Sequence, residues 1–219
     1  MPSALARKLA ILLCLACPAG AQAAKLTALV YSSDGKPLGN AVVAAHPDSG
    51  RLPPATSSVE VVDQIDKEFV PYVKPVRVGS TVQFPNKDNI RHHVYSFSPA
   101  KPFELPLYSG TPAKPLLFDK VGIVKLGCNI HDWMIGYVYV TETPYFGKTA
   151  ANGRVDLDQL PPGRYRVQVW HPRMEVSEDE TIKRLDVEEA TPGAAEWKLK
   201  LKREFRPRRA PLPGEPGYR

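Results

Sequence analysis

Three residue types that bind soft metals stand close together in the stretch GCNIHDWM, residues 127 to 134. Cys128, His131 and Met134 follow the spacing C-x2-H-x2-M. A thiolate, an imidazole and a thioether suit copper, for which one cysteine and two histidines form a trigonal plane with a weak axial methionine. The spacing therefore predicts a copper site that still lacks one histidine.

Strands on both sides of this stretch are expected to aim its sulfur atoms inward. Alternation of apolar and polar residues from Val124 to Cys128 turns the thiol toward a core. Beyond the loop, Met134 falls on the inward face of the strand predicted over 135–141. His131 lies in the turn between them. A strand end, a tight turn and a strand start thus bring three ligand atoms to one point.

The missing histidine is expected from a distant strand. The segment GSTVQFPNKDNIRHHVYSFS, residues 79 to 98, holds His92 and His93 at the start of a predicted strand. Tyr95 and Phe97 share the face of His93, so alternation alone leaves both histidines open.

These segments resemble the cupredoxins, the family of plastocyanin, amicyanin and pseudoazurin. The matching text is GSTVQFPN, then HHV, then CNIHDWM, and the resemblance covers residues 59–141. It implies a Greek-key β-barrel or sandwich that binds one copper ion cycling between Cu(I) and Cu(II). The ligands it implies are His92, Cys128, His131 and the axial Met134. His93 is the alternative to His92, and it occupies a position where the family has an asparagine.

The same resemblance implies a function. It predicts a single-electron carrier in which His131, the more exposed ligand, is the electron exit, and in which Trp133 and Ile135 form a small apolar docking patch. The partner would be a redox protein, such as a cytochrome, a dehydrogenase or an oxidase, held by weak and transient contact. We expect a monomer.

The rest of the chain predicts an all-β protein, because apolar and polar residues alternate in short runs broken by Gly, Pro, Asn and Asp. Strands are expected over 164–170 and 196–202, and a hairpin over 25–46 with its turn at Asp34-Gly35. The text LTALVYSSDGKPLGNAVVAAHP and the text GKTAANGRVDLDQLPPGRYRVQVWHP resemble carboxypeptidase regulatory-like (Cna-B-like, transthyretin-like) β-sandwiches. The cupredoxin-like block lies between these two pieces.

We therefore predict an inserted domain. The first part of the regulatory-like sandwich spans 24–58, the cupredoxin domain 59–141 and the second part 142–202. A basic tail rich in Pro and Gly, 203–219, is expected to be disordered. The whole arrangement resembles exported bacterial proteins of the methylamine-utilisation or plastocyanin-like type.

The first 23 residues resemble a secretory signal peptide. Arg7 and Lys8 precede an apolar run, and the sequence Ala-Gln-Ala ends at Ala23, where we expect cleavage. The run is too short to span a membrane. A lipid anchor at Cys14 or Cys17 is the alternative. The protein is thus expected to be exported, most simply to a bacterial periplasm.

The net charge of the chain restricts the classes of partner that it can be expected to bind. The formal charge is +6, and loss of Arg7 and Lys8 with the leader leaves +4, much of it in the tail, so nucleic acid is not an expected partner. Cleavage also leaves Cys128 as the one cysteine, which cannot form an internal disulfide.

Several other interpretations of the same residues stay open. Cys128 alone could be a small buried hydrophobe, or Cys128 and His131 could bind zinc, although a structural zinc site has no use for Met134. A cysteine nucleophile with a histidine base is the catalytic alternative, and we expect no enzyme. Copper trafficking without a redox partner, and a scaffold with structural copper, are the two other functions to be tested.

Overall fold

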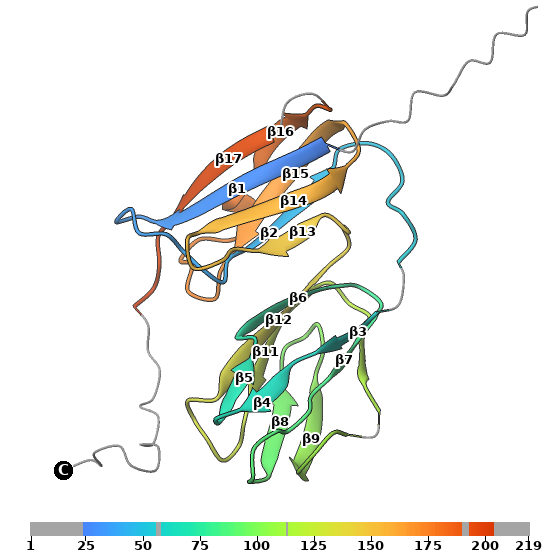
Figure 1. Ribbon diagram of the computed structural model, residues 1–219, viewed down its shortest axis with the longest axis vertical. Helices are drawn as coiled ribbons and strands as arrows, with labels where there is room; N and C mark the ends of the chain where they lie inside the picture. The colour runs from blue at the N-terminus through green and yellow to red at the C-terminus, as the bar shows by residue number, and fades with distance from the viewer. Residues whose placement is uncertain (1–23, 56–57, 113, 190–192, 204–219) are drawn as a thin grey trace, which may run out of the picture.

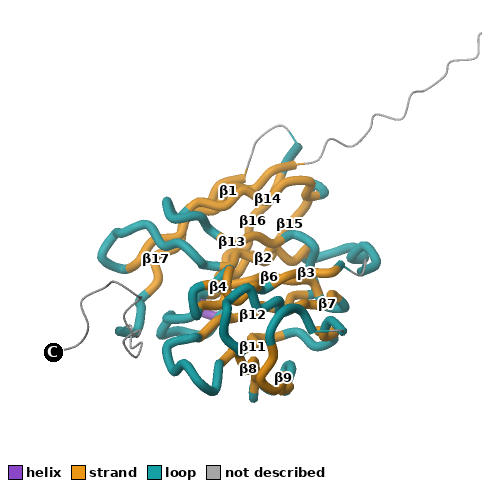
Figure 2. Tube along the Cα trace, turned by 60° about the horizontal axis from the view of Figure 1, so that its bottom comes forward, coloured by secondary structure: helices purple, strands orange, loops and turns teal. Residues whose placement is uncertain are grey.

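The computed structural model describes residues 24–55, 58–112, 114–189 and 193–203. The predicted leader and all of the predicted tail except Arg203 lie outside the described residues. The prediction of an all-β protein is confirmed: the described chain consists of strands, loops and one 3-10 helix, η1 (Asp179–Thr181) (Figure 2). No helix of this part is long and apolar enough to cross a membrane.

Strands from both ends of the chain build one group of two sheets, which we call the terminal lobe (Figure 1). One sheet has the order β14-β1-β17 and the other β13-β2-β15-β16, and an apolar core fills the space between them. The strands are β1 (Ala24–Ser32), β2 (Val42–Pro47), β13 (Phe146–Lys148), β14 (Arg154–Leu160), β15 (Gly163–Trp170), β16 (Lys183–Val187) and β17 (Gly193–Leu199).

The predicted hairpin over 25–46 is wrong. Strands β1 and β2 belong to different sheets: β1 pairs with β14 and β17, and β2 pairs with β13 and β15. The reason lies in burial. Val43 and Ala45 of β2 face the core of the terminal lobe, whereas Val42 and Ala44 pack on the other side against the rest of the protein. A strand with two apolar faces belongs inside the molecule and not in a hairpin with one wet face.

Residues 59–141 build a second group of sheets, the central lobe (Figure 1). A five-stranded sheet has the order β6-β12-β11-β8-β9, a three-stranded sheet has the order β10-β7-β3, and β4 and β5 form a separate pair. The strands are β3 (Val59–Val61), β4 (Asp63–Ile65), β5 (Glu68–Val70), β6 (Val73–Arg77), β7 (Ser80–Gln83), β8 (His92–Ser96), β9 (Phe103–Tyr108), β10 (Leu116–Phe118), β11 (Gly122–Gly127) and β12 (Ile135–Thr141).

The core of the central lobe contains two of the predicted metal ligands. Val124, Leu126 and Cys128 are buried while Lys125 is exposed, which is the alternation that the sequence predicts. Met134 belongs to the same buried cluster. Strands β11 and β12 pair antiparallel with Gly127 opposite Ile135, so the loop from Cys128 to Met134 closes tightly at one end of the sheet.

The two lobes share an interface built largely from aromatic side chains. Trp170 of β15 packs against Tyr137 and Tyr139 of β12, with ring centroids 5.5 and 5.6 Å apart. The Tyr139 hydroxyl donates a hydrogen bond to the Glu178 carboxylate, which also accepts one from Gln168 at 3.2 Å. Despite these donors, burial raises the pKa of Glu178. This carboxylate is therefore a charge that the interface tolerates at some cost.

We expect Glu178→Gln to gain stability relative to the wild type as the pH rises. A raised folded-state pKa means that the stabilising contribution of Glu178 is present below its ordinary value of 4.5 and is lost as the pH passes through the folded-state value. Glutamine cannot ionise and escapes this loss. Urea unfolding of both proteins between about pH 4 and pH 8 measures the difference.

Glu180→Gln is the matched control, because its carboxylate is exposed and hydrogen bonds from Ser177 lower its pKa. This variant should lose stability relative to the wild type as the pH rises, the opposite trend. If the stability of both variants relative to the wild type changes with pH in the same way, Glu178 is not a carboxylate that burial at the interface destabilises.

Candidate metal centre

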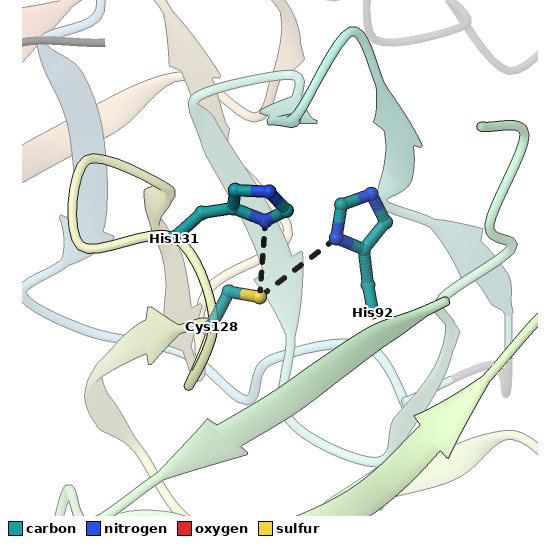
Figure 3. A group of neighbouring side chains, drawn as sticks. All are labelled: His92, Cys128 and His131. Atoms are coloured by element: carbon teal, nitrogen blue, oxygen red, sulfur yellow. Dashed lines mark hydrogen bonds between the residues drawn. The ribbon is translucent and has the colours of Figure 1, made fainter. Parts of the chain in front are cut away.

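Cys128, His92 and His131 converge on one point of the central lobe (Figure 3). The Cys128 Sγ lies 3.8 Å from Nδ1 of His92 and 3.8 Å from Nδ1 of His131, and all three atoms lie within 4.8 Å of one another. A thiol has a single proton to donate, so it cannot satisfy both imidazole nitrogens at once. A thiolate and two neutral imidazoles whose protons lie on Nε2 would direct three lone pairs at one cation here.

The two sulfur–nitrogen separations are of the size that one shared metal ion would produce. Bonds of about 2.0–2.1 Å to nitrogen and about 2.3 Å to sulfur, the values for zinc, place the two atoms about 3.8 Å apart at a bond angle of about 120°. A tetrahedral angle would bring them to about 3.6 Å. The observed 3.8 Å for both pairs fits a single metal ion held by the thiolate and the two imidazoles.

Short loops and strand ends hold the ligands in place. Cys128 follows β11 directly and His92 is the first residue of β8. The loop between β11 and β12 is closed by the Met134 amide, which donates to the His131 carbonyl at 2.9 Å. Rigid strands thus supply one side of the site and a hydrogen-bonded turn supplies the other.

The structure places His92, and not His93, beside the thiol. His92 is fully buried, whereas the His93 ring turns to the other face of β8, where its Nε2 lies 3.0 Å from the Glu104 carboxylate. The His93 ring also contacts Tyr95 edge-on. Alternation along β8 separates the two histidines, and only His92 joins the cluster.

Met134 lies on the sulfur side of the site. It is buried in the same apolar cluster as Cys128, which keeps the thioether inside the lobe. Both residues also line a pocket of about 480 Å³ whose outer wall includes Tyr95 and Phe97. The role of Met134 as the axial ligand stays a prediction.

The surface around His131 differs from the predicted docking patch. The Trp133 ring packs against the His131 ring at an angle of 55°, with centroids 5.0 Å apart, and Trp133 and Ile135 are both partly buried. Ile130, which the sequence interpretation did not select, is 47% exposed beside His131. An apolar residue next to a ligand in a short turn was the signal that could have identified it. Ile130 adds exposed apolar surface to the partly buried Trp133 and Ile135, and the docking role of these residues stays a prediction.

Electrostatics favour a neutral imidazole at His131. Burial lowers its pKa, and the neighbouring His92 and Lys67 lower it further, against a weaker opposing effect of Asp88. A neutral ring has a nitrogen lone pair available for a metal at neutral pH.

Sequence reasoning missed Asp88, which contacts a ligand. Its Oδ2 lies 2.7 Å from Nε2 of His92, on the ring edge away from Cys128. Burial opposes ionisation of Asp88, but hydrogen bonds from the Lys67 amide, His92 and the Asp66 amide outweigh it and lower the pKa of its carboxyl. An acidic residue four positions before the ligand was the available signal.

The pair β4–β5 closes one side of the site. The turn residues Asp66 and Lys67 donate their amides to Asp88, and Phe69 of β5 packs on β12. This packing depends on Gly136, because a Cβ there would stand 2.8 Å from the Phe69 Cβ. The absence of a side chain at Gly136 therefore lets the pair approach the strand that follows Met134.

No protein-family model and no curated protein matches the chain. Among solved structures it is similar to the Cu-containing nitrite reductase NirK from Thermus scotoductus SA-01, with 25% identity, a TM-score of 0.37 and 44% of this chain covered. This chain covers a quarter (25%) of that reductase. It is also similar to a purple cupredoxin from Nitrosopumilus maritimus, with 22% identity, a TM-score of 0.34, and 37% of this chain and 99% of that one covered.

A third similar structure is a mutant of amicyanin in its oxidised state, with 26% identity, a TM-score of 0.35, and 38% of this chain and 82% of that one covered. All three TM-scores are below 0.5. The chemistry of this chain is therefore inferred from its own side chains. The resemblance of the terminal lobe to regulatory-like sandwiches stays a prediction.

We expect Gly136→Ala to destabilise the protein by about 1–3 kcal/mol, the usual cost of forcing a methyl group into a packed site. The added methyl would push Phe69 and its strand away from β12. Gly193→Ala is the control, since the nearest atom to its new Cβ is a terminal methyl of Leu26 at 3.2 Å, which can move aside. Equal losses in urea unfolding would contradict the close-approach argument.

Proposed function

We propose that this chain is a mononuclear type 1 (blue) copper protein that carries single electrons. The observation that carries the proposal is the placement of the buried Cys128 Sγ at the same distance, 3.8 Å, from Nδ1 of His92 and of His131. Met134, buried in the same cluster, would complete the set as the axial ligand.

The ligand types favour copper over zinc. Within the described residues, the cluster around Cys128 comprises three Cys or His side chains, whereas a structural zinc site normally uses four. The thioether of Met134 does not favour zinc, whereas a methionine thioether is a common axial ligand of copper.

When bound, copper would supply a one-electron change between Cu(I) and Cu(II). The protein's own part is to hold the ligands still. Cys128 and His92 sit at the ends of paired strands, and Val124 and Leu126 beside the thiol are fully buried, which excludes water from that side. A site that keeps one geometry in both charge states needs little rearrangement when an electron moves.

We propose a carrier rather than an enzyme, with His131 as the exit for the electron. Ile130 and Trp133 surround that ligand with apolar surface, which suits small and transient contacts with a redox protein such as a cytochrome, a dehydrogenase or an oxidase. The leader sequence supports export to a periplasm.

Copper titration tests the proposal directly. We expect Cu(II) added to the metal-free protein to produce an intense thiolate-to-copper absorption band and narrow copper hyperfine splitting in electron paramagnetic resonance. Cys128→Ser should lose both, because the thiolate is removed. A wild-type protein without the band would contradict the blue-copper site.

The same sample separates electron transfer from copper trafficking. A carrier should keep its copper through repeated reduction and oxidation in the presence of a Cu(I) chelator. Loss of the metal to the chelator on reduction would favour trafficking.

Charge placed on the apolar surface should slow electron exchange. We expect Ile130→Lys to lower the rate of self-exchange between the Cu(I) and Cu(II) forms by about tenfold or more, because two like charges would face each other across the contact. Leu117→Lys, at a residue of similar exposure (46%) on β10, is the control and should change little. Nuclear magnetic resonance line broadening measures both rates, and equal rates would remove this surface from the proposal.

A further inference from the structure

Asp88 lies in the loop between β7 and β8, four residues before His92, and binds the ring nitrogen that faces away from the thiol. Its Oδ2 is 2.7 Å from His92 Nε2, and the side chains of the two residues are 12% and 0% exposed. The contact is thus almost closed to water. It occupies the one ring position of His92 through which the protein can act on Nδ1, the atom that faces Cys128.

The carboxylate determines which nitrogen of His92 carries a proton. An ionised carboxylate only accepts hydrogen bonds, so Nε2 must be the donor, and in the neutral ring Nδ1 then carries the lone pair. That lone pair is aimed at the position between Cys128 and His131. Hydrogen bonds of this kind orient ligating histidines and raise their basicity.

Both carboxylate oxygens of Asp88 are in use. Oδ1 accepts the Asp66 amide at 2.7 Å, while Oδ2 accepts the Lys67 amide at 2.9 Å in addition to His92. Asp66 and Lys67 have positive φ angles of 54° and 61°, so the turn presents both amides to one acceptor group. An asparagine has one acceptor oxygen in place of two, so its amide nitrogen would face either the Asp66 amide or the Lys67 amide and His92.

The loop that carries Asp88 is itself fixed. Its amide donates to Oδ1 of Asn86 at 3.0 Å, and Nδ2 of Asn86 donates to the carbonyls of Ile90 and Tyr108 at 2.8 and 2.9 Å. The aspartate is therefore held on its own side by Asn86 and on the other by the β4–β5 turn.

We propose that Asp88 is the positioning residue of the metal centre, which fixes the tautomer and orientation of His92 and tunes the metal through it. This inference rests on the proposed copper function. A negative charge on the far side of the ring makes Nδ1 a stronger donor and favours Cu(II) over Cu(I). Asp88 should therefore hold the reduction potential down.

Glu104 offers a matched control within the same strand pair. Its carboxylate lies 3.0 Å from Nε2 of His93, so it makes a similar acid–histidine contact at a histidine outside the cluster, and its side chain is 68% exposed. Glu104→Gln removes the same charge from a neighbouring position without touching the His92 ring. A general effect of charge would appear in both variants, and a positioning effect only at Asp88.

The first experiment uses the metal-free protein and does not depend on copper chemistry. In ¹⁵N-labelled wild type, long-range nitrogen–proton spectra should show His92 protonated at Nε2, with a proton that exchanges slowly with water. In Asp88→Ala, which removes the acceptor that faces Nε2, the fixed tautomer and the slow exchange should be lost. A wild-type ring protonated at Nδ1 would overturn the proposal, and this holds even where the variant fails to fold.

The second experiment measures Cu(II) affinity and reduction potential. Asp88→Asn should weaken Cu(II) binding about 10–100-fold, the usual effect of removing such a partner. A tenfold greater loss for Cu(II) than for Cu(I) raises the potential by about 59 mV. Glu104→Gln should change neither quantity. If folded Asp88→Asn keeps the Cu(II) affinity and the reduction potential of the wild type, Asp88 only accepts hydrogen bonds from the β4–β5 turn, and the proposal is overturned.

The outcomes separate this inference from the copper function. A wild type that gives no thiolate-to-copper band but shows the fixed Nε2 tautomer retains the positioning of His92, and the affinity measurement is then made with Zn(II). A wild type with the band and a freely exchanging His92 ring retains the copper function and loses the role of Asp88.

Discussion

The convergence of a buried thiol with the imidazole nitrogens of one buried and one partly exposed histidine is the constraint on which the central lobe depends. Sets of lone pairs that face one another without enough protons to pair them are costly to bury. The surrounding structure holds them there nonetheless. Cys128 and His92 are fixed by β11 and β8, and the loop that carries His131 is closed by its own backbone hydrogen bond. The packing of the lobe thus maintains a site that a cation would complete.

Much of this site could be predicted because its ligands lie on regular strands. The period of two along β11 fixed the direction of Cys128, and the spacing C-x2-H-x2-M placed His131 in the turn. The choice between His92 and His93 could not be made from alternation, since residues on both faces of β8 are apolar or aromatic. The structure places His92 beside Cys128, because the face of β8 that carries His92 and Val94 turns to the core of the central lobe and His93 turns to the other face.

The features that the sequence interpretation missed depend on contacts between distant segments. In the sequence, Asp88 looks like an ordinary acidic loop residue. Only the folded structure shows that it contacts both the β4–β5 turn and the His92 ring. The apolar surface near His131 depends on the contact between the Trp133 and His131 rings, which covers part of the Trp133 side chain. The hairpin predicted from β1 and β2 failed for a similar reason, because local turn signals do not reveal a strand that is buried on both faces.

Strand β12 connects these observations, because its two faces serve different parts of the protein. Val138 and Val140 face the core that contains Cys128 and continue the inward face of Met134. Tyr137 and Tyr139 face the terminal lobe, where Trp170 packs on both. A shift of register by one residue would exchange the faces and break the metal centre and the interface at once. The terminal lobe therefore stabilises the register of the strand that presents the methionine, although it lies on the opposite side of the sheet from the ligands.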